Sequence, residues 1–142
     1  MTKSQHVYLF VYGSLRPGWK VSKDIPGATI ARRALQLQAR HLGSAQVNGQ
    51  LYDLGDYPGL RLEDSGHQTI GDLYEILDLS LLTTLDRYEG CDLLSPTPHE
   101  YRRIQVMLES KDIPFPHPVW VYEWILEQDD AQTIPGGDWL KR

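Results

Sequence analysis

The fold is organised around one stretch near the N-terminus, Tyr8-Leu9-Phe10-Val11-Tyr12-Gly13-Ser14-Leu15-Arg16-Pro17-Gly18. From Val7 to Val11 every residue is β-branched, aromatic or aliphatic, without polar alternation, and the run is too short for a helix. This pattern is typical of a central strand that is covered on both faces. Gly13 and Ser14 then end the strand in a turn.

A glycine turn at the end of a buried strand can point consecutive backbone N–H groups into one small space. Such a group of donors binds a carboxylate or an oxyanion that develops during a reaction. A plain strand-to-loop junction has the same sequence pattern. The stretch alone leaves both interpretations open.

Composition narrows the class of protein. The chain has 142 residues, a formal net charge of −5 and one cysteine, Cys91. The length predicts a single domain, residues 1–142, and the acidic balance argues against a nucleic-acid partner. No stretch has the ~20 apolar residues that span a membrane, and the residues before the first strand lack the apolar run of a leader peptide, so none is expected. A lone cysteine fits a reducing compartment, so we expect a cytoplasmic protein.

Further strands are predicted where short apolar or alternating runs lie between turns rich in glycine and proline. These runs are residues 34–39, 47–54, 60–62, 69–77, 100–108 and 119–125. Gly71, inside one of them, predicts a bulge or the close approach of another backbone. We expect an α+β fold, a small mixed, mostly antiparallel β-barrel of about six or seven strands with one main flanking helix. Residues 127–142 are expected to be a loosely packed tail in which Trp139 docks on the body.

The helix is predicted from about Ser80 to Glu89, with Gly90 just past its end. Its apolar stripe consists of Leu81, Leu82, Leu85 and Tyr88. Glu89 falls inside this stripe, where burial disfavours its charge, and at the helix C-terminus, where the helix dipole does the same. Both effects raise the pKa of the carboxyl toward neutrality, as a general acid or base requires. The alternative is a helix that frays and turns Glu89 out into water.

The sequence offers little support for a metal site, a serine or cysteine nucleophile, or a nucleotide-binding site. The five histidines stand far apart without paired ligand spacing, so no metal site is predicted. Ser14 lacks the second glycine of a nucleophile elbow, and no glycine-rich nucleotide-binding motif is present. Cys91 with His99 is a possible thiol nucleophile and base, although a lone cysteine more often fills space in the core.

Several motifs, read together, resemble those of the gamma-glutamylcyclotransferase-like family, in its small bacterial and gamma-glutamylamine cyclotransferase branch. The similar segments run nearly from end to end: Tyr12 to Gly18, Asp53-Leu54-Gly55-Asp56-Tyr57-Pro58-Gly59-Leu60, Gly71-Asp72-Leu73-Tyr74-Glu75-Ile76, Leu85-Asp86-Arg87-Tyr88-Glu89-Gly90, Tyr101-Arg102-Arg103, Trp120-Val121-Tyr122 and Gly137-Asp138-Trp139. The fold of that family, a small mixed barrel with flanking helices, agrees with the architecture expected here.

The resemblance implies a cofactor-independent enzyme that releases 5-oxoproline from a small γ-glutamyl substrate by intramolecular aminolysis. Glu89 matches the family's general acid/base. The substrate loop matches Tyr12, Gly13, Ser14 and Leu15, and Tyr101 matches a tyrosine of the pocket wall. A non-catalytic, metabolite-binding member of the same fold is the alternative.

The chain departs from many relatives between Cys91 and Glu100, where its loop is longer. This loop is expected at the mouth of the pocket, where it would affect the leaving-group preference. It can also bring Glu100 near Glu89.

Overall fold

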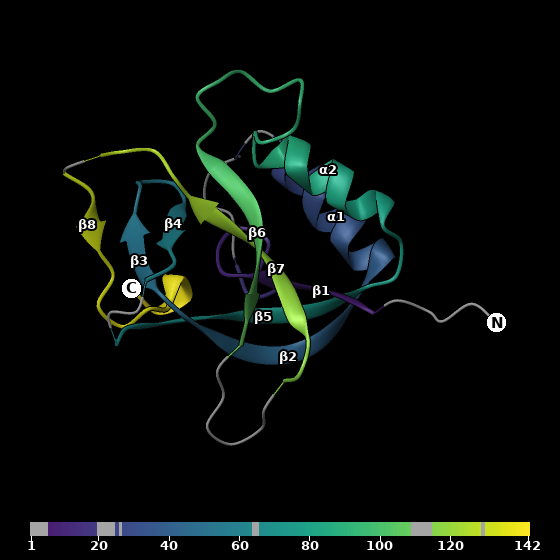
Figure 1. Cartoon of the computed structure of the whole chain (residues 1–142), viewed down its shortest axis with the longest axis horizontal. Helices are drawn as coiled ribbons and strands as arrows, with labels where there is room; N and C mark the ends of the chain where they lie inside the picture. Colours follow the sequence, from purple (N-terminus) through teal and green to yellow (C-terminus); the bar gives the residue numbers. More distant parts are fainter. Residues whose placement is uncertain (1–5, 20–24, 26, 64–65, 109–114, 129) are drawn as a thin grey trace.

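The computed structural model describes residues 6–19, 25, 27–63, 66–108, 115–128 and 130–142 (Figure 1). Residues 1–5, where no leader is expected, lie outside this part of the chain. The described residues form two β-sheets and two α-helices, and the α+β class is therefore confirmed. None of the described helices is both long enough and apolar enough to cross a membrane.

The larger sheet has the strand order β2-β5-β1-β7-β6. Its strands are β1 (Val7–Val11), β2 (Ala39–Asn48), β5 (Gln68–Ile76), β6 (Tyr101–Met107) and β7 (Pro118–Trp124). The first strand is central, as its apolar run predicts: it pairs antiparallel with β5 and parallel with β7, and Leu9 is fully buried. Because β1 is held on both sides, the turn that follows it has a fixed position.

The smaller sheet has the order β4-β3-β8, with β3 (Gln50–Asp53), β4 (Pro58–Arg61) and β8 (Gln132–Thr133). It packs against the larger sheet where Gly59 of β4 lies close to the Trp124 ring of β7. The two sheets stay open and do not close into the expected barrel. The described strands β2 and β6 lie at opposite edges of the larger sheet, and Gly49 lets the chain leave that sheet between β2 and β3.

Helix α1 (Ala28–Gln38) occupies residues for which a strand was predicted at 34–39, and that prediction is wrong. Alternation over only six residues is too short to exclude a helical period. Ala28, Ala31 and Leu35 recur at helical spacing and are buried, whereas Leu37 is 70% exposed. The fold thus has two flanking helices instead of one main helix.

Helix α2 (Ser80–Tyr88) is confirmed within a residue of its predicted range and packs beside α1 (Figure 1). The Asp78 carboxylate accepts hydrogen bonds from the Ser80 N–H at 3.0 Å and from Ser80 Oγ at 2.8 Å. Leu81 and Leu85 are fully buried against the sheet. Gly90 has φ 70°, a left-handed conformation that glycine adopts without strain and that ends the helix.

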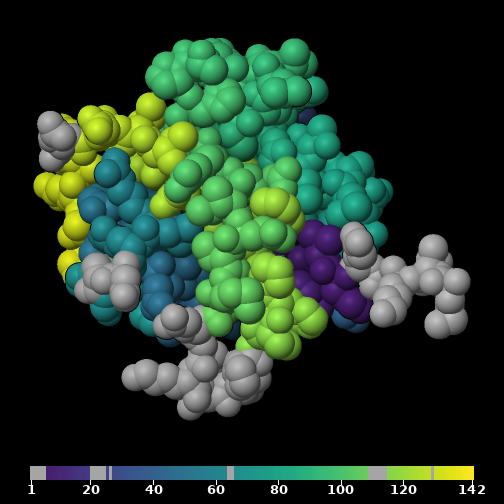
Figure 2. All heavy atoms as spheres, viewed as in Figure 1, coloured from purple at the N-terminus to yellow at the C-terminus, as the bar shows by residue number. Residues whose placement is uncertain are grey.

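The C-terminal segment lies beside β3, with which β8 pairs (Figure 2, yellow beside blue). Ile134 and Trp139 are buried, and the Ile134 N–H donates to the Leu51 carbonyl at 2.8 Å. The Asp138 carboxylate accepts a hydrogen bond from the buried Arg16 guanidinium at 2.8 Å. The end of the chain is therefore attached to the turn that follows β1.

Candidate active site

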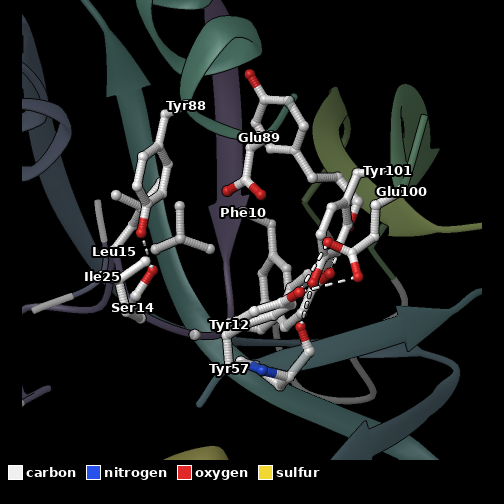
Figure 3. Close-up of a pocket in the computed structure, with 14 residues that line it drawn as sticks. Phe10, Tyr12, Ser14, Leu15, Ile25, Tyr57, Tyr88, Glu89, Glu100 and Tyr101 are labelled. Atoms are coloured by element: carbon white, nitrogen blue, oxygen red, sulfur yellow. Dashed lines mark hydrogen bonds between the residues drawn. The ribbon is translucent and has the colours of Figure 1, made fainter. Parts of the chain in front are cut away.

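A cavity of about 170 Å³ opens between the turn after β1, the C-terminal end of α2, and the start of β6 (Figure 3). The site residues predicted from the sequence all line it: Tyr12, Gly13, Ser14, Leu15, Glu89 and Tyr101. These residues come from three separate segments of the chain. The fold therefore brings the predicted turn and the predicted glutamate together in one pocket.

The turn at Gly13 is closed by a hydrogen bond from the Arg16 N–H to the Gly13 carbonyl at 3.0 Å. The N–H groups of Ser14 and Leu15 donate to no other group within the described part of the chain. A Cβ on Gly13 would lie 2.8 Å from Pro58, so only glycine lets the turn pack this closely on β4. The turn can thus offer backbone donors to an anion in the pocket.

Glu89 extends the hydrogen-bonding pattern of α2, since its N–H donates to the Leu85 carbonyl at 2.8 Å. Its carboxyl points into the pocket instead of turning outward from a frayed helix end (Figure 3). Burial raises the pKa of Glu89 to about 8, with further contributions from the negative charges of Glu100 and Asp86. A carboxyl with this pKa can both accept and return a proton near neutral pH.

Asp86, one turn before Glu89, fixes this end of the helix. Its carboxylate accepts from Arg103 Nε at 2.7 Å and from the Tyr122 hydroxyl at 2.8 Å. The Arg103 guanidinium also lies over the Trp120 ring, 4.2 Å from its centroid. Strands β6 and β7 therefore hold α2 in the orientation that directs Glu89 inward.

Tyrosine side chains form much of the pocket wall. The Tyr101 hydroxyl donates to the Pro58 carbonyl at 2.7 Å, and the Tyr12 hydroxyl donates to the Tyr122 carbonyl. Burial raises the pKa of both Tyr12 and Tyr101 above the usual tyrosine value, so these phenols stay neutral. The backbone already binds both hydroxyls, which leaves the two rings to shape the cavity.

On the turn side of the pocket, the Ser14 hydroxyl and the Tyr88 hydroxyl form a hydrogen bond of 2.7 Å (Figure 3). Burial raises the pKa of Tyr88, and so does the negative charge of Glu89. The sequence pattern places Tyr88 in the apolar stripe of the helix and in the motif that ends at Gly90, but predicts no role for its hydroxyl. Its place beside Ser14 comes from the packing of α2 against the turn.

Glu100 and Tyr57 line the opposite side of the pocket. The Tyr57 hydroxyl donates to both carboxylate oxygens of Glu100, at 2.9 and 3.0 Å. Burial and this bond raise the pKa of Tyr57 to about 12. The long loop before Glu100 had indicated that this residue can lie near Glu89. No pocket role was predicted for Tyr57, although it belongs to the motif Asp56-Tyr57-Pro58-Gly59.

Cys91 lies outside the set of described residues that line the pocket. Burial, together with the negative charges of Asp86 and Glu89, raises the pKa of its thiol to about 12. A thiolate is therefore scarce at neutral pH, which argues against a cysteine nucleophile. Among the described histidines, cysteines and carboxylates, no group of three is placed to hold a metal ion.

The family model for AIG2-like gamma-glutamyl cyclotransferase matches residues 9–141. The chain belongs to this family. The search of the curated proteins gave no match.

Solved structures of similar fold include ytfP from Escherichia coli, an AIG2-like protein from Mus musculus and an uncharacterised protein from Pyrococcus horikoshii. The bacterial ytfP is 27% identical over 94% of this chain and 96% of its own, with a TM-score of 0.63. The mouse protein is 23% identical over 88% and 81%, with a TM-score of 0.64. The Pyrococcus protein is 19% identical over 95% and 91%, with a TM-score of 0.65. The gamma-glutamyl cyclotransferase fold thus covers nearly the whole chain.

Proposed function

We propose that this protein is a cytoplasmic, cofactor-independent γ-glutamyl cyclotransferase that releases 5-oxoproline from a small γ-glutamyl compound. One observation carries the proposal: the inward carboxyl of Glu89, with its pKa near 8, shares a pocket with the turn of Gly13, Ser14 and Leu15. The pocket thus combines a group that transfers protons with backbone donors for an anion.

In the proposed reaction the α-amino nitrogen of the glutamyl unit attacks its own γ-carbonyl carbon. A new C–N bond closes the five-membered lactam, and the bond from the γ-carbon to the leaving nitrogen breaks. Glu89 takes one proton from the α-ammonium before the attack and passes it to the leaving nitrogen. After the attack the ring nitrogen loses a second proton, which the departing amine takes up, so that 5-oxoproline and the protonated amine result. Well-oriented intramolecular attack is intrinsically fast, so positioning supplies much of the rate.

The raised pKa of Glu89 suits this role. The α-amino group of a peptide N-terminus has a pKa of about 8, and the free α-carboxylate of a γ-glutamyl unit places it somewhat higher, still close to the value of about 8 for Glu89. Proton transfer between two groups of similar pKa needs little free energy in either direction. The N–H groups of Ser14 and Leu15 would hold the substrate's carboxylate or the carbonyl oxygen as it gains charge.

The proposal is tested by incubating the protein with γ-glutamyl amines, γ-glutamyl amino acids and γ-glutamyl peptides, and assaying 5-oxoproline. Product from one class is the expected result. If the protein binds a γ-glutamyl compound but forms no 5-oxoproline across the panel, the non-catalytic, metabolite-binding alternative replaces the proposal.

Glu89→Gln should lower kcat by about 10²- to 10⁴-fold, because the amide keeps the shape of the side chain but cannot take a proton. Circular dichroism checks that the variant is folded. Cys91→Ala is the matched control and should retain activity, since the thiol lies outside the pocket lining. Near-normal turnover by Glu89→Gln, or loss of turnover in Cys91→Ala, would contradict the assigned roles.

A further inference from the structure

Glu100 is a pocket residue that the proposed chemistry does not use. It comes directly before β6, and its carbonyl accepts a hydrogen bond from the Ile125 N–H at 2.8 Å. Its side chain is held by the Tyr57 hydroxyl, which donates to both carboxylate oxygens. The backbone and the side chain of Glu100 are therefore both fixed at the wall of the pocket.

Glu100 and the turn lie on opposite sides of Glu89. In Figure 3, Ser14 and Tyr88 are on one side of the Glu89 carboxyl, and Glu100, which Tyr57 contacts, is on the other. The charge effects agree with this placement: the negative charge of Glu89 raises the pKa of all four tyrosines, Tyr12, Tyr57, Tyr88 and Tyr101, whereas that of Glu100 raises the pKa of Tyr12, Tyr57 and Tyr101. A substrate that reaches from the turn past Glu89 would next meet Glu100.

The pocket lining has acidic groups without basic ones. Among the described residues that line it, Glu89 and Glu100 carry carboxyl groups and none is a lysine or an arginine. The nearby Arg103 is occupied by Asp86. Tyr57 donates a single hydroxyl hydrogen, which leaves acceptor capacity on the two oxygens of Glu100. A second cationic group in the bound molecule, besides the α-ammonium, would satisfy this carboxylate.

We infer that Glu100, held in place by Tyr57, binds a positively charged group on the leaving amine, so that the preferred substrates are γ-glutamyl conjugates of diamines or of similar cationic amines. The inference rests on the proposed function, which places the glutamyl part at the turn and the reacting carbon beside Glu89. The leaving group then extends toward Glu100. Neutral leaving amines of the same length lack the group that this carboxylate binds.

The test compares two conjugates that differ at one atom position, γ-glutamyl-1,4-diaminobutane and γ-glutamyl-n-pentylamine, in which a methyl group replaces the terminal ammonium. The wild-type protein should prefer the cationic conjugate by about tenfold or more in kcat/KM, as expected for a hydrogen bond to a charged group. Glu100→Gln should bring the ratio close to one. Tyr57→Phe, which releases the carboxylate, should lower the ratio to an intermediate value.

Glu63→Gln is the matched control, because Glu63 is exposed and does not line the pocket, and it should keep the wild-type ratio. The inference is overturned if Glu100→Gln keeps the preference. It is equally overturned if the variant loses the same factor with both conjugates, since Glu100 would then act on the shared glutamyl part.

Binding of the same two conjugates, measured by calorimetry, separates this inference from the proposed function. Suppose that neither conjugate is turned over. Tighter binding of the cationic conjugate to the wild type, and loss of that difference in Glu100→Gln, would support the role of Glu100 and refute the cyclotransferase. Equal binding of the two conjugates to the wild type would refute the role of Glu100.

Discussion

At the scale of single residues, Glu89 occupies a position where a negative charge is unfavourable for several reasons. Its carboxyl lies within the protein, at the C-terminal end of α2, and near the carboxylates of Glu100 and Asp86. Burial is the largest of the effects that raise its pKa to about 8. A carboxyl kept protonated in this way serves proton transfer, and it lowers the stability of the folded protein wherever it must ionise.

The first prediction is that Glu89→Gln stabilises the protein at alkaline pH. The carboxyl has an ordinary pKa of 4.5 when unfolded and about 8 when folded. Between pH 4.5 and about 8, the folded protein keeps a proton on Glu89 that the unfolded chain has lost. The contribution of the protonated Glu89 to the free energy of unfolding is therefore fully present below pH 4.5 and is lost as the pH rises to about 8. The slope is at most about 1.4 kcal/mol per pH unit. Because glutamine does not titrate, the free energy of unfolding of the variant does not fall in this way.

Urea denaturation at pH 5.5, 7 and 9 measures the difference in free energy of unfolding between Glu89→Gln and the wild type. The difference should move in favour of the variant from pH 5.5 to 9, and the exposed Glu63→Gln should show no such trend. A difference that stays constant over this range would mean that the pKa of Glu89 is not raised in the folded state.

At the scale of secondary-structure elements, the close contact between β1 and β5 sets the position of the turn. Val11 is the last residue of β1 and pairs with Asp72 of β5. A Cβ on the neighbouring Gly71 would overlap the Val11 carbonyl oxygen and would lie 2.6 Å from Phe10 Cζ. Gly71 therefore permits the close approach of two backbones, which is one of the two roles that its place in a strand predicted.

The second prediction is that Gly71→Ala destabilises the protein by about 1–3 kcal/mol, because the added methyl group must push β1 away from β5. Gly136→Ala is the matched control, since a Cβ at Gly136 meets no atom within 4 Å. Thermal unfolding of both variants checks the difference. A Gly71→Ala protein as stable as the Gly136→Ala protein would show that the strands can separate without loss.

At the scale of the whole molecule, Arg16 connects three parts of the chain that are distant in sequence. Its side chain is buried, and its guanidinium donates from Nε to Asp72 of β5 and from Nη1 to Asp138 of the C-terminal segment, both at 2.8 Å. His41 of β2 also contacts the Asp72 carboxylate, at 2.8 Å. The turn that lines the pocket is thus anchored to the larger sheet and to the end of the chain at the same point.

The third prediction is that Arg16→Gln destabilises the protein by about 3–5 kcal/mol, because it leaves buried carboxylates without their cation. Arg87→Gln is the control: the Arg87 side chain is 71% exposed and lies 3.4 Å from Asp92, and its loss should be worth less than about 1 kcal/mol. Urea denaturation compares the two. Equal losses in the free energy of unfolding for the two substitutions would show that Arg16 does not anchor the turn.

The same substitution should also raise KM for a γ-glutamyl substrate more than it lowers kcat, because Arg16 holds the binding turn and does not touch Glu89. Kinetics on the folded fraction, below the unfolding transition, measure both constants. A fall in kcat alone would indicate that Arg16 acts on the chemical step instead.

The family and the central part of the site could be predicted from the sequence because both depend on short, local patterns. An apolar run ending in Gly13 predicted a buried strand and a turn, and helical spacing placed Glu89 within the apolar stripe at the end of α2. The direction of the pKa shift of Glu89 follows from the same two facts, its helix end and its burial. These features need no knowledge of which distant segments meet.

The central strand, the turn, helix α2 and the place of Glu89 in its apolar stripe follow from the sequence alone, whereas the inward direction of the Glu89 carboxyl depends on the packing of the helix end. Only the tertiary structure decided that residues 34–39 are helical, that the two sheets stay open, and that Tyr57 and Glu100 face Glu89 across one pocket. The physical reason is that a short alternating run satisfies two periods equally, and the edges and side chains that meet are selected by packing between segments far apart in the chain.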